Sequence, residues 1–194
     1  ADVVKIIDKI TYASPSSKIN FTGGNIFLYS QIEKLLTYLI EKKMKANFYF
    51  NYLNWNRKYQ DIIFSGNIIL HIYIMTPIDH IQIRNIIIFF KQKPEVLQFI
   101  FVVQSEQELL AAQTLISDFE ISQYSIMPFY NNKNLKFFKQ VVFIDINDLQ
   151  SASPTKRDIY KRQYINMFDL GKLILSSSGN YYSNMNFSPL GNIT

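Results

Sequence analysis

The sequence contains no cysteine, two histidines and one tryptophan. Without thiolates, the 194 residues form no disulfide and hold neither a cysteine zinc site nor an iron–sulfur cluster, and two histidines alone do not make a metal site. No apolar run approaches the ~20 residues that span a bilayer, and we expect no signal peptide among these residues. We therefore expect a cytoplasmic protein with no membrane partner and no metal site among these residues.

Charge of either sign is sparse. Charged residues make up 18% of the chain, the net charge is +5, and hydrophobic residues make up 48%, which is typical of a folded core. The densest basic groups, residues 41–45 and 156–162, include acids or apolar residues, as solvated helix ends do. We expect no nucleic-acid partner. The sequence also contains no P-loop and no nucleophile–base arrangement, so we assign no catalytic residue.

Segments with helical periodicity alternate with short, nearly continuous apolar segments. The apolar segments predict strands at 18–21, 46–52, 67–75, 97–103, 124–128 and 141–144. The periodic segments predict helices at 2–12, 26–43, 58–64, 79–91, 105–119 and 134–139. Asp79 caps one of these helices, and Ser105 with Glu108 forms a capping box for another. Such strand–helix units are typical of a parallel sheet covered by helices, so the fold class we expect is α/β.

The turns that follow the strands form the predicted binding site. Right-handed crossovers place every strand-to-helix turn of a parallel sheet at one rim, where ligands bind in barrels and in open sheets. Candidate residues for ligand contact at this rim are Asn54, Trp55, Thr76, Gln104 and Tyr130. The alternative for the aromatic side chains is a place in the core.

Residues 21–25, Phe-Thr-Gly-Gly-Asn, end the first strand and lead into a helix. Two glycines at such a turn expose backbone N–H groups beside a helix N-terminus, which suits an anionic or zwitterionic ligand. The plainer interpretation is a tight connection, because glycine fits where backbones crowd. We predict that a ligand binds at Thr22, Gly23, Gly24 and Asn25.

The chain changes character after Gln150. Residues 151–155, Ser-Ala-Ser-Pro-Thr, predict a linker, and residues 158–163 predict a helical segment. Residues 171–176 and 180–184 predict a β-hairpin that turns at 177–179. The chain then ends Phe-Ser-Pro-Leu-Gly-Asn-Ile-Thr. We predict two parts, 1–150 and 151–194.

These motifs resemble those of radical-SAM proteins. Residues 22–25 are similar to the "TGGE" signature on the second strand of the radical-SAM barrel, a turn that binds the amino group of S-adenosylmethionine. The C-terminal hairpin followed by Leu-Gly-Asn-Ile at 190–193 is similar to the start of a SPASM or twitch extension in peptide-modifying members. The resemblance implies a partial (β/α) barrel of radical-SAM type with parallel strands over 1–150, lacking its first strand. It implies a linker helix and a truncated SPASM/twitch-like hairpin over 151–194.

Two positions depart from the family pattern. Asn25 stands where the family carries an acid, so a contact with S-adenosylmethionine would lose its charge-assisted part, ~1–2 kcal/mol. Asn184 stands where a cysteine ligates an auxiliary cluster, so the resemblance implies that this cluster is absent. The CxxxCxxC loop of the primary 4Fe-4S cluster is expected upstream of Ala1. We therefore expect no cofactor within these residues, and S-adenosylmethionine with a 4Fe-4S cluster if the parent protein is active.

The two departures resemble those of degenerate pseudo-radical-SAM proteins in peptide-maturation gene clusters. The resemblance implies a non-catalytic protein that binds a peptide or a partner maturase at the barrel rim. The alternative is an active radical-SAM enzyme that cleaves S-adenosylmethionine to modify a peptide. A third interpretation, from the glycine turn alone, is an unrelated α/β domain that binds a phosphate-bearing ligand. We also expect the sheet edge at 18–22 to pair with a second copy of the chain or to be covered by a helix.

Overall fold

The computed structural model describes residues 3–13, 18–142, 155–157, 160 and 171–192. The chain divides into two compact units: residues 14–143 form the larger one, and residues 1–13 with 144–194 form the other. The boundary predicted at residue 150 lies outside the described residues and stays a prediction. Among the described residues, no helix is long and apolar enough to cross a membrane.

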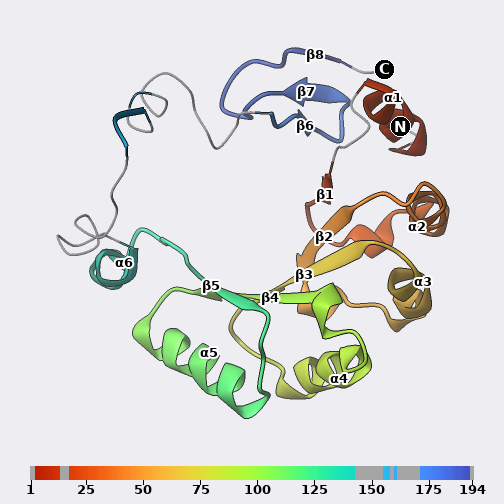
Figure 1. The fold of residues 1–194 in the computed structure, drawn as a ribbon. Helices are drawn as coiled ribbons and strands as arrows, with labels where there is room; N and C mark the ends of the chain where they lie inside the picture. Colours follow the sequence, from red (N-terminus) through yellow and green to blue (C-terminus); the bar gives the residue numbers. More distant parts are fainter. Residues whose placement is uncertain (1–2, 14–17, 143–154, 158–159, 161–170, 193–194) are drawn as a thin grey trace. The chain divides into compact units, whose positions relative to one another are not determined.

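The larger unit is built on a parallel sheet whose strands follow their order in the chain (Figure 1). Each strand pairs in parallel with the next one. The strands are β1 (Ile19–Phe21), β2 (Ala46–Asn51), β3 (Ile68–Ile74), β4 (Leu97–Val103) and β5 (Tyr124–Pro128). This confirms the predicted α/β class with parallel strands. Because neighbouring strands are consecutive, the sheet has the order of part of a (β/α) barrel.

Helices cover one face of this sheet. Figure 1 shows the following helices along the same side of the row of strands: α2 (Ile32–Glu41), α3 (Gln60–Ser65), α4 (His80–Phe90) and α5 (Glu106–Asp118). Alternate strand residues point to that side, since successive side chains of a strand face opposite ways. The four such residues of β3 are almost wholly buried: Ile68, Leu70, Ile72 and Ile74. The core of the unit therefore lies between the sheet and these helices.

The helix starts at Asp79 and Ser105 are confirmed. The Asp79 carboxylate accepts hydrogen bonds from the backbone N–H groups of Ile81 and Gln82, both at 3.0 Å. The Ser105 hydroxyl accepts one from the Glu108 N–H at 3.2 Å. Each side chain pairs a donor that the first helical turn leaves without a partner, which fixes where α4 and α5 begin.

The helix predicted over 26–43 is wrong in its first part. Residues Ile26–Leu28 form a short 3-10 helix, η1, and α2 starts only at Ile32. Tyr29, between them, has an extended backbone, with φ −65° and ψ 121°. The apolar periodicity misled because Phe27 turns into an aromatic cluster with side chains from β2 and from residues beyond it. Tertiary contacts there override the helical pattern.

The last strand predicted in this part, 141–144, is also wrong where it is described. Val141 and Val142 close helix α6 (Leu135–Val142), and residues 143–144 lie outside the described part. Their β-branched side chains favour a strand, but they continue the amphipathic pattern of the preceding helix.

The smaller unit contains α1 (Val3–Ala13) and an antiparallel sheet. Strands β6 (Ile174–Leu175) and β7 (Asn180–Tyr182) form the predicted hairpin. A third strand that we did not predict, β8 (Gly191–Asn192), pairs with β7. The predicted linker at 151–155 and helix at 158–163 lie almost entirely outside the described residues.

Candidate functional site

The predicted site residues are distributed over the loops that follow the five parallel strands. Parallel strands place their carboxyl ends at one edge, so these loops share the rim of the sheet. The loops after β2 to β5 begin with the 3-10 helix η2 (Tyr52–Asn54), Met75, Gln104 and Phe129, and the predicted Thr76 follows Met75. The topology therefore gathers the predicted residues, and the contacts below show which of them touch.

The turn after β1 is open and strained for any residue but glycine. Gly23 has φ +100° and Gly24 has φ +62°, in the region that L-residues rarely adopt. A Cβ added to either glycine would meet no atom within 4 Å. The glycines are thus required by backbone conformation and not by crowding. Thr22, Gly23 and Gly24 are all exposed, so this turn leaves its backbone accessible to a ligand.

The Asn25 side chain caps the short helix that follows it. Its Oδ1 accepts a hydrogen bond from the Phe27 backbone N–H at 3.0 Å and so caps η1. The α-helix N-terminus that we expected beside the glycines is not there, because α2 starts seven residues after Asn25, at Ile32. The predicted anion-binding helix end is therefore absent from this turn, which presents the backbone of Gly23 and Gly24 alone.

Trp55 lies in an aromatic cluster under the rim. Its ring is 5.8 Å from Phe27, 6.3 Å from Phe50 and 5.1 Å from Phe90, centroid to centroid. Phe90 belongs to α4, so Trp55 faces the helical layer. Its Nε1–H is buried and has no hydrogen-bond partner within the described structure. Asn54, next to it, is half-buried in η2.

A polar network joins the loops after β3, β4 and β5. Glu108 accepts hydrogen bonds from the Thr76 hydroxyl and from the Gln104 backbone N–H, both at 2.6 Å. The Gln104 side-chain oxygen accepts one from Asn131 Nδ2 at 2.9 Å, and the Gln104 carbonyl accepts one from Asn134 Nδ2 at 2.7 Å. Two predicted residues, Thr76 and Gln104, are thus fixed in place.

Glu108 was missed as a site residue. The capping box predicted that its carboxylate bonds back to the start of the helix, but one oxygen goes to Gln104 and the other to Thr76 on a neighbouring loop. Tyr130 contacts α6, its ring 5.5 Å from Phe138. Tyr130 is exposed at the end of the same group of loops.

The sheet face opposite the helices carries polar and aromatic side chains. Asn47 Nδ2 donates to Asn20 Oδ1 at 2.9 Å, and the Tyr49 ring stacks on His71 with centroids 4.3 Å apart. Burial, with a smaller effect of the Lys18 charge, lowers the pKa of His71. His71 Nε2 and Asn47 Oδ1 are buried without a hydrogen-bond partner in the described structure. The position of His71 on the face opposite the helices was not predicted.

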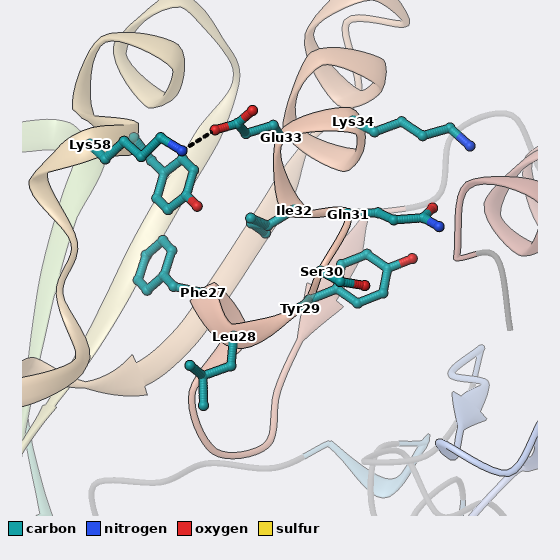
Figure 2. A pocket seen from close by; sticks show the side chains of 10 residues that line it. Phe27, Leu28, Tyr29, Ser30, Gln31, Ile32, Glu33, Lys34 and Lys58 are labelled. Atoms are coloured by element: carbon teal, nitrogen blue, oxygen red, sulfur yellow. Dashed lines mark ion pairs between the residues drawn. The ribbon is translucent and has the colours of Figure 1, made fainter.

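An open pocket of about 600 Å³ lies beside the rim (Figure 2). It is lined by residues 27–34 with Lys58 and Tyr59. Lys58 Nζ is 2.5 Å from a Glu33 carboxylate oxygen, so one acid and one base of the lining pair with each other. The Phe27 and Tyr59 rings are stacked at 5.4 Å. Figure 2 shows Leu28 pointing away from the Phe27 ring.

The hairpin of the smaller unit is held by asparagine and glycine. Asn192 Nδ2 donates to Asn180 Oδ1 at 2.7 Å, and the Asn184 side chain accepts the Asn186 N–H at 2.8 Å. A Cβ on Gly191 would collide with the Tyr181 ring. Among the described residues, no three His, Cys, Asp or Glu side chains lie together as a metal site would require.

No family model matches the sequence, and no curated protein does. The fold is similar to that of SuiB from Streptococcus suis. The structure of SuiB bound to S-adenosylmethionine matches with a TM-score of 0.58 and 14% identity, over 98% of this chain and 55% of SuiB. SuiB bound to its precursor peptide SuiA matches with a TM-score of 0.64 and 13% identity, over 97% and 55%.

A further SuiB structure gives a TM-score of 0.58 at 14% identity, over 97% of this chain and 56% of SuiB. At this identity the likeness shows the fold alone, and the chain spans about half the length of SuiB. The fold is the predicted one, a partial (β/α) barrel of the radical-SAM type with a C-terminal antiparallel hairpin. The assignment of that hairpin to a SPASM or twitch extension remains a prediction.

Proposed function

We propose that this chain is a radical-SAM-like protein of a peptide-modification system, which binds a peptide or a partner maturase at the barrel rim without catalysing a reaction itself. The observation that carries the proposal is the rim itself. It combines an exposed glycine turn with loops fixed by Glu108, Thr76 and Gln104. The fold supports the peptide part of the proposal, because SuiB has this fold and was solved with its precursor peptide.

The non-catalytic part rests on the chemistry of the covered positions. A 4Fe-4S cluster needs thiolate ligands, and these 194 residues contain none. The residues of the chain therefore do not fit the cluster, and we derive no step through it. At the glycine turn, Asn25 already accepts the Phe27 N–H and carries no charge, so it is a weak acceptor for an ammonium group.

The competing function is an active radical-SAM enzyme whose cluster ligands lie outside these residues. One observation favours it: a structure with the same fold, SuiB, holds S-adenosylmethionine. The open backbone of Gly23 and Gly24 leaves space for a ligand at this turn. Under this alternative, the parent protein would bind S-adenosylmethionine and cleave it. Both functions would operate in the cytoplasm.

Iron content separates the two functions. The full-length parent protein is purified without oxygen, supplied with iron and sulfide, and assayed for bound iron and for the visible absorption of a cluster. The proposed function predicts no cluster band and no 5′-deoxyadenosine when S-adenosylmethionine and reductant are added. About four irons per chain together with 5′-deoxyadenosine would establish the enzyme and overturn the non-catalytic proposal.

A further inference from the structure

Large apolar side chains are exposed on the rim loops after β1, β2, β3 and β5. Leu28 in η1 is 80% exposed, Leu53 in η2 is 60% exposed, and Met75, directly after β3, is 40% exposed. Phe129 and Tyr130, after β5, are 50% and 42% exposed. We call these five residues the apolar rim. Single exposed apolar residues are ordinary, but one on each of several adjoining loops is a feature of binding surfaces.

Side-chain contacts hold the loops of Leu28, Leu53 and Met75 together. The Phe27 ring, next to Leu28, lies 5.0 Å from Phe50 and 5.8 Å from Trp55, which flank the Leu53 turn. The Tyr52 hydroxyl donates to the Pro77 carbonyl at 3.3 Å and accepts the Asp79 N–H at 2.7 Å. These two hydrogen bonds of Tyr52 therefore fix the Leu53 turn against the loop that begins at Met75.

The other end of the apolar rim is fixed in the same way. The Phe129 N–H donates to the Val103 carbonyl at 2.8 Å, and the Phe129 carbonyl accepts from Asn134 Nδ2 at 2.8 Å. Asn134 also bonds the Gln104 carbonyl. The exposed apolar side chains thus project from loops whose backbones are already ordered, so a partner would not have to order them on binding.

The parts of the rim loops next to the strands carry no charge. Charged residues are 18% of the chain, yet Asp, Glu, Lys and Arg are all missing from the ranges 22–32, 52–56, 75–78, 104–105 and 128–132. Their polar side chains are mostly hydroxyls and amides, which suit the N–H and C=O groups of a peptide backbone. A charged ligand would find no counter-charge on these parts of the loops and would lose water without compensation there.

Several of the nearest charges along the chain are engaged, while Glu106 and Lys133 are exposed. Asp79 caps α4, and Glu33 pairs with Lys58. The Arg57 guanidinium lies over the Phe89 ring, 4.3 Å from its centroid. Glu108 is held by its two hydrogen bonds within the polar network. The engaged groups therefore do not supply an electrostatic anchor for a charged segment.

We propose that the apolar rim binds an uncharged peptide segment, anchored by large apolar side chains of that peptide. This inference rests on the proposed function and names its ligand class. Apolar burial supplies the affinity, while the amides and hydroxyls of the rim bond the peptide backbone. Binding is then largely independent of salt, because no ion pair forms across the interface.

The test uses the full chain and three dye-labelled synthetic peptides of equal length. One peptide is uncharged and rich in Leu, Phe and Asn, one is acidic and one is basic. Fluorescence anisotropy gives Kd at low and at high salt. The uncharged peptide is expected to bind tightest, with a Kd that changes less than about twofold between the two salt concentrations.

Two matched variants locate the binding. Leu53→Asp is expected to raise the Kd of the uncharged peptide at least about tenfold. Leu110→Asp is the control: Leu110 is 58% exposed, close to the 60% of Leu53, but lies on α5. It should leave Kd unchanged. Circular dichroism shows whether each variant is folded, and Leu28→Asp repeats the test at a second rim position.

Each other outcome overturns the inference in a recognisable way. Tight, salt-sensitive binding of the acidic or basic peptide refutes the uncharged ligand but leaves peptide binding intact. Binding of no peptide, together with a maturase contact that Leu53→Asp does not weaken, refutes the inference while the proposed function stands. If neither a peptide nor a maturase binds, both the inference and the proposed function are refuted. Self-association that Leu53→Asp abolishes, measured by sedimentation, would make the apolar rim a contact between copies of the chain.

Discussion

The Glu108 carboxylate is the junction between the rim loops after β3 and β4, and replacing it gives a quantitative test of the site. In Glu108→Gln one carboxylate oxygen becomes an amide NH2 group, which accepts no hydrogen bond, so one of the two bonds from Thr76 and Gln104 is lost. A hydrogen bond to a charged group contributes ~1.5–3 kcal/mol. Because the Thr76 contact is exposed and the Gln104 contact partly buried, we take the lower end, a loss of about 1–2 kcal/mol.

The matched control is Glu106→Gln. Glu106 and Glu108 lie in the same first turn of α5, so both substitutions remove a favourable charge from the helix N-terminus, worth ~0.3–1 kcal/mol. Glu106 is exposed. Urea unfolding followed by circular dichroism measures both variants, with equal m-values as the check on two-state behaviour. Equal losses of unfolding free energy in the two variants would refute the stabilising role of the Glu108 hydrogen bonds.

A double-mutant cycle isolates one of the bonds. Thr76→Val removes the hydroxyl that donates to Glu108 at 2.6 Å. In a cycle with Glu108→Ala, which removes both carboxylate oxygens, the double variant should lose less than the sum of the single losses, by about 0.5–1.5 kcal/mol, because both substitutions remove the Thr76–Glu108 bond. Strict additivity would mean that the contact contributes nothing to stability.

Three further predictions concern the glycine turn, the opposite sheet face and the hairpin. Gly24→Ala, at φ +62°, should lower the free energy of unfolding by about 1–2 kcal/mol, and an unchanged urea midpoint would contradict the left-handed turn. His71 has a lowered pKa, so its contribution to stability is complete above the ordinary 6.5 and is lost as pH falls through the lowered value. His71→Phe should make the urea midpoint less dependent on pH over that window. An unaltered pH dependence in this variant would exclude His71 as the cause of the loss of stability. Gly191→Ala should disrupt the β7–β8 pair seen by NMR, and Tyr181→Ala should restore it in the double variant; a hairpin undisturbed by Gly191→Ala would contradict the close contact.

The parallel sheet was predictable because its strands are nearly continuous apolar runs. β4 and β5 have the bounds that the sequence predicted, 97–103 and 124–128. Buried parallel strands need apolar side chains on both faces, and helices that cover them show a helical period. The caps at Asp79 and Ser105 were also predictable, because a cap depends on local backbone donors alone.

The missed features depend on contacts between segments distant in the chain. The interruption of the helix before Ile32 follows from Phe27 entering a cluster with Tyr59 and Phe50. The second oxygen of Glu108 accepts a hydrogen bond from Thr76, which lies thirty-two residues away in the sequence. Local periodicity carries no signal for either contact. The candidate site could therefore be located from the strand order, while its polar network could not.

The central claim, that the rim is the peptide-binding surface, is tested most directly by hydrogen exchange. Amide exchange of the full chain is followed by mass spectrometry with and without a saturating uncharged peptide. Peptide binding at the rim predicts slower exchange in residues 22–32, 52–56 and 75–78, and no change in residues 174–192 of the hairpin. Protection confined to the hairpin, or unchanged rim loops with the peptide bound, would contradict it.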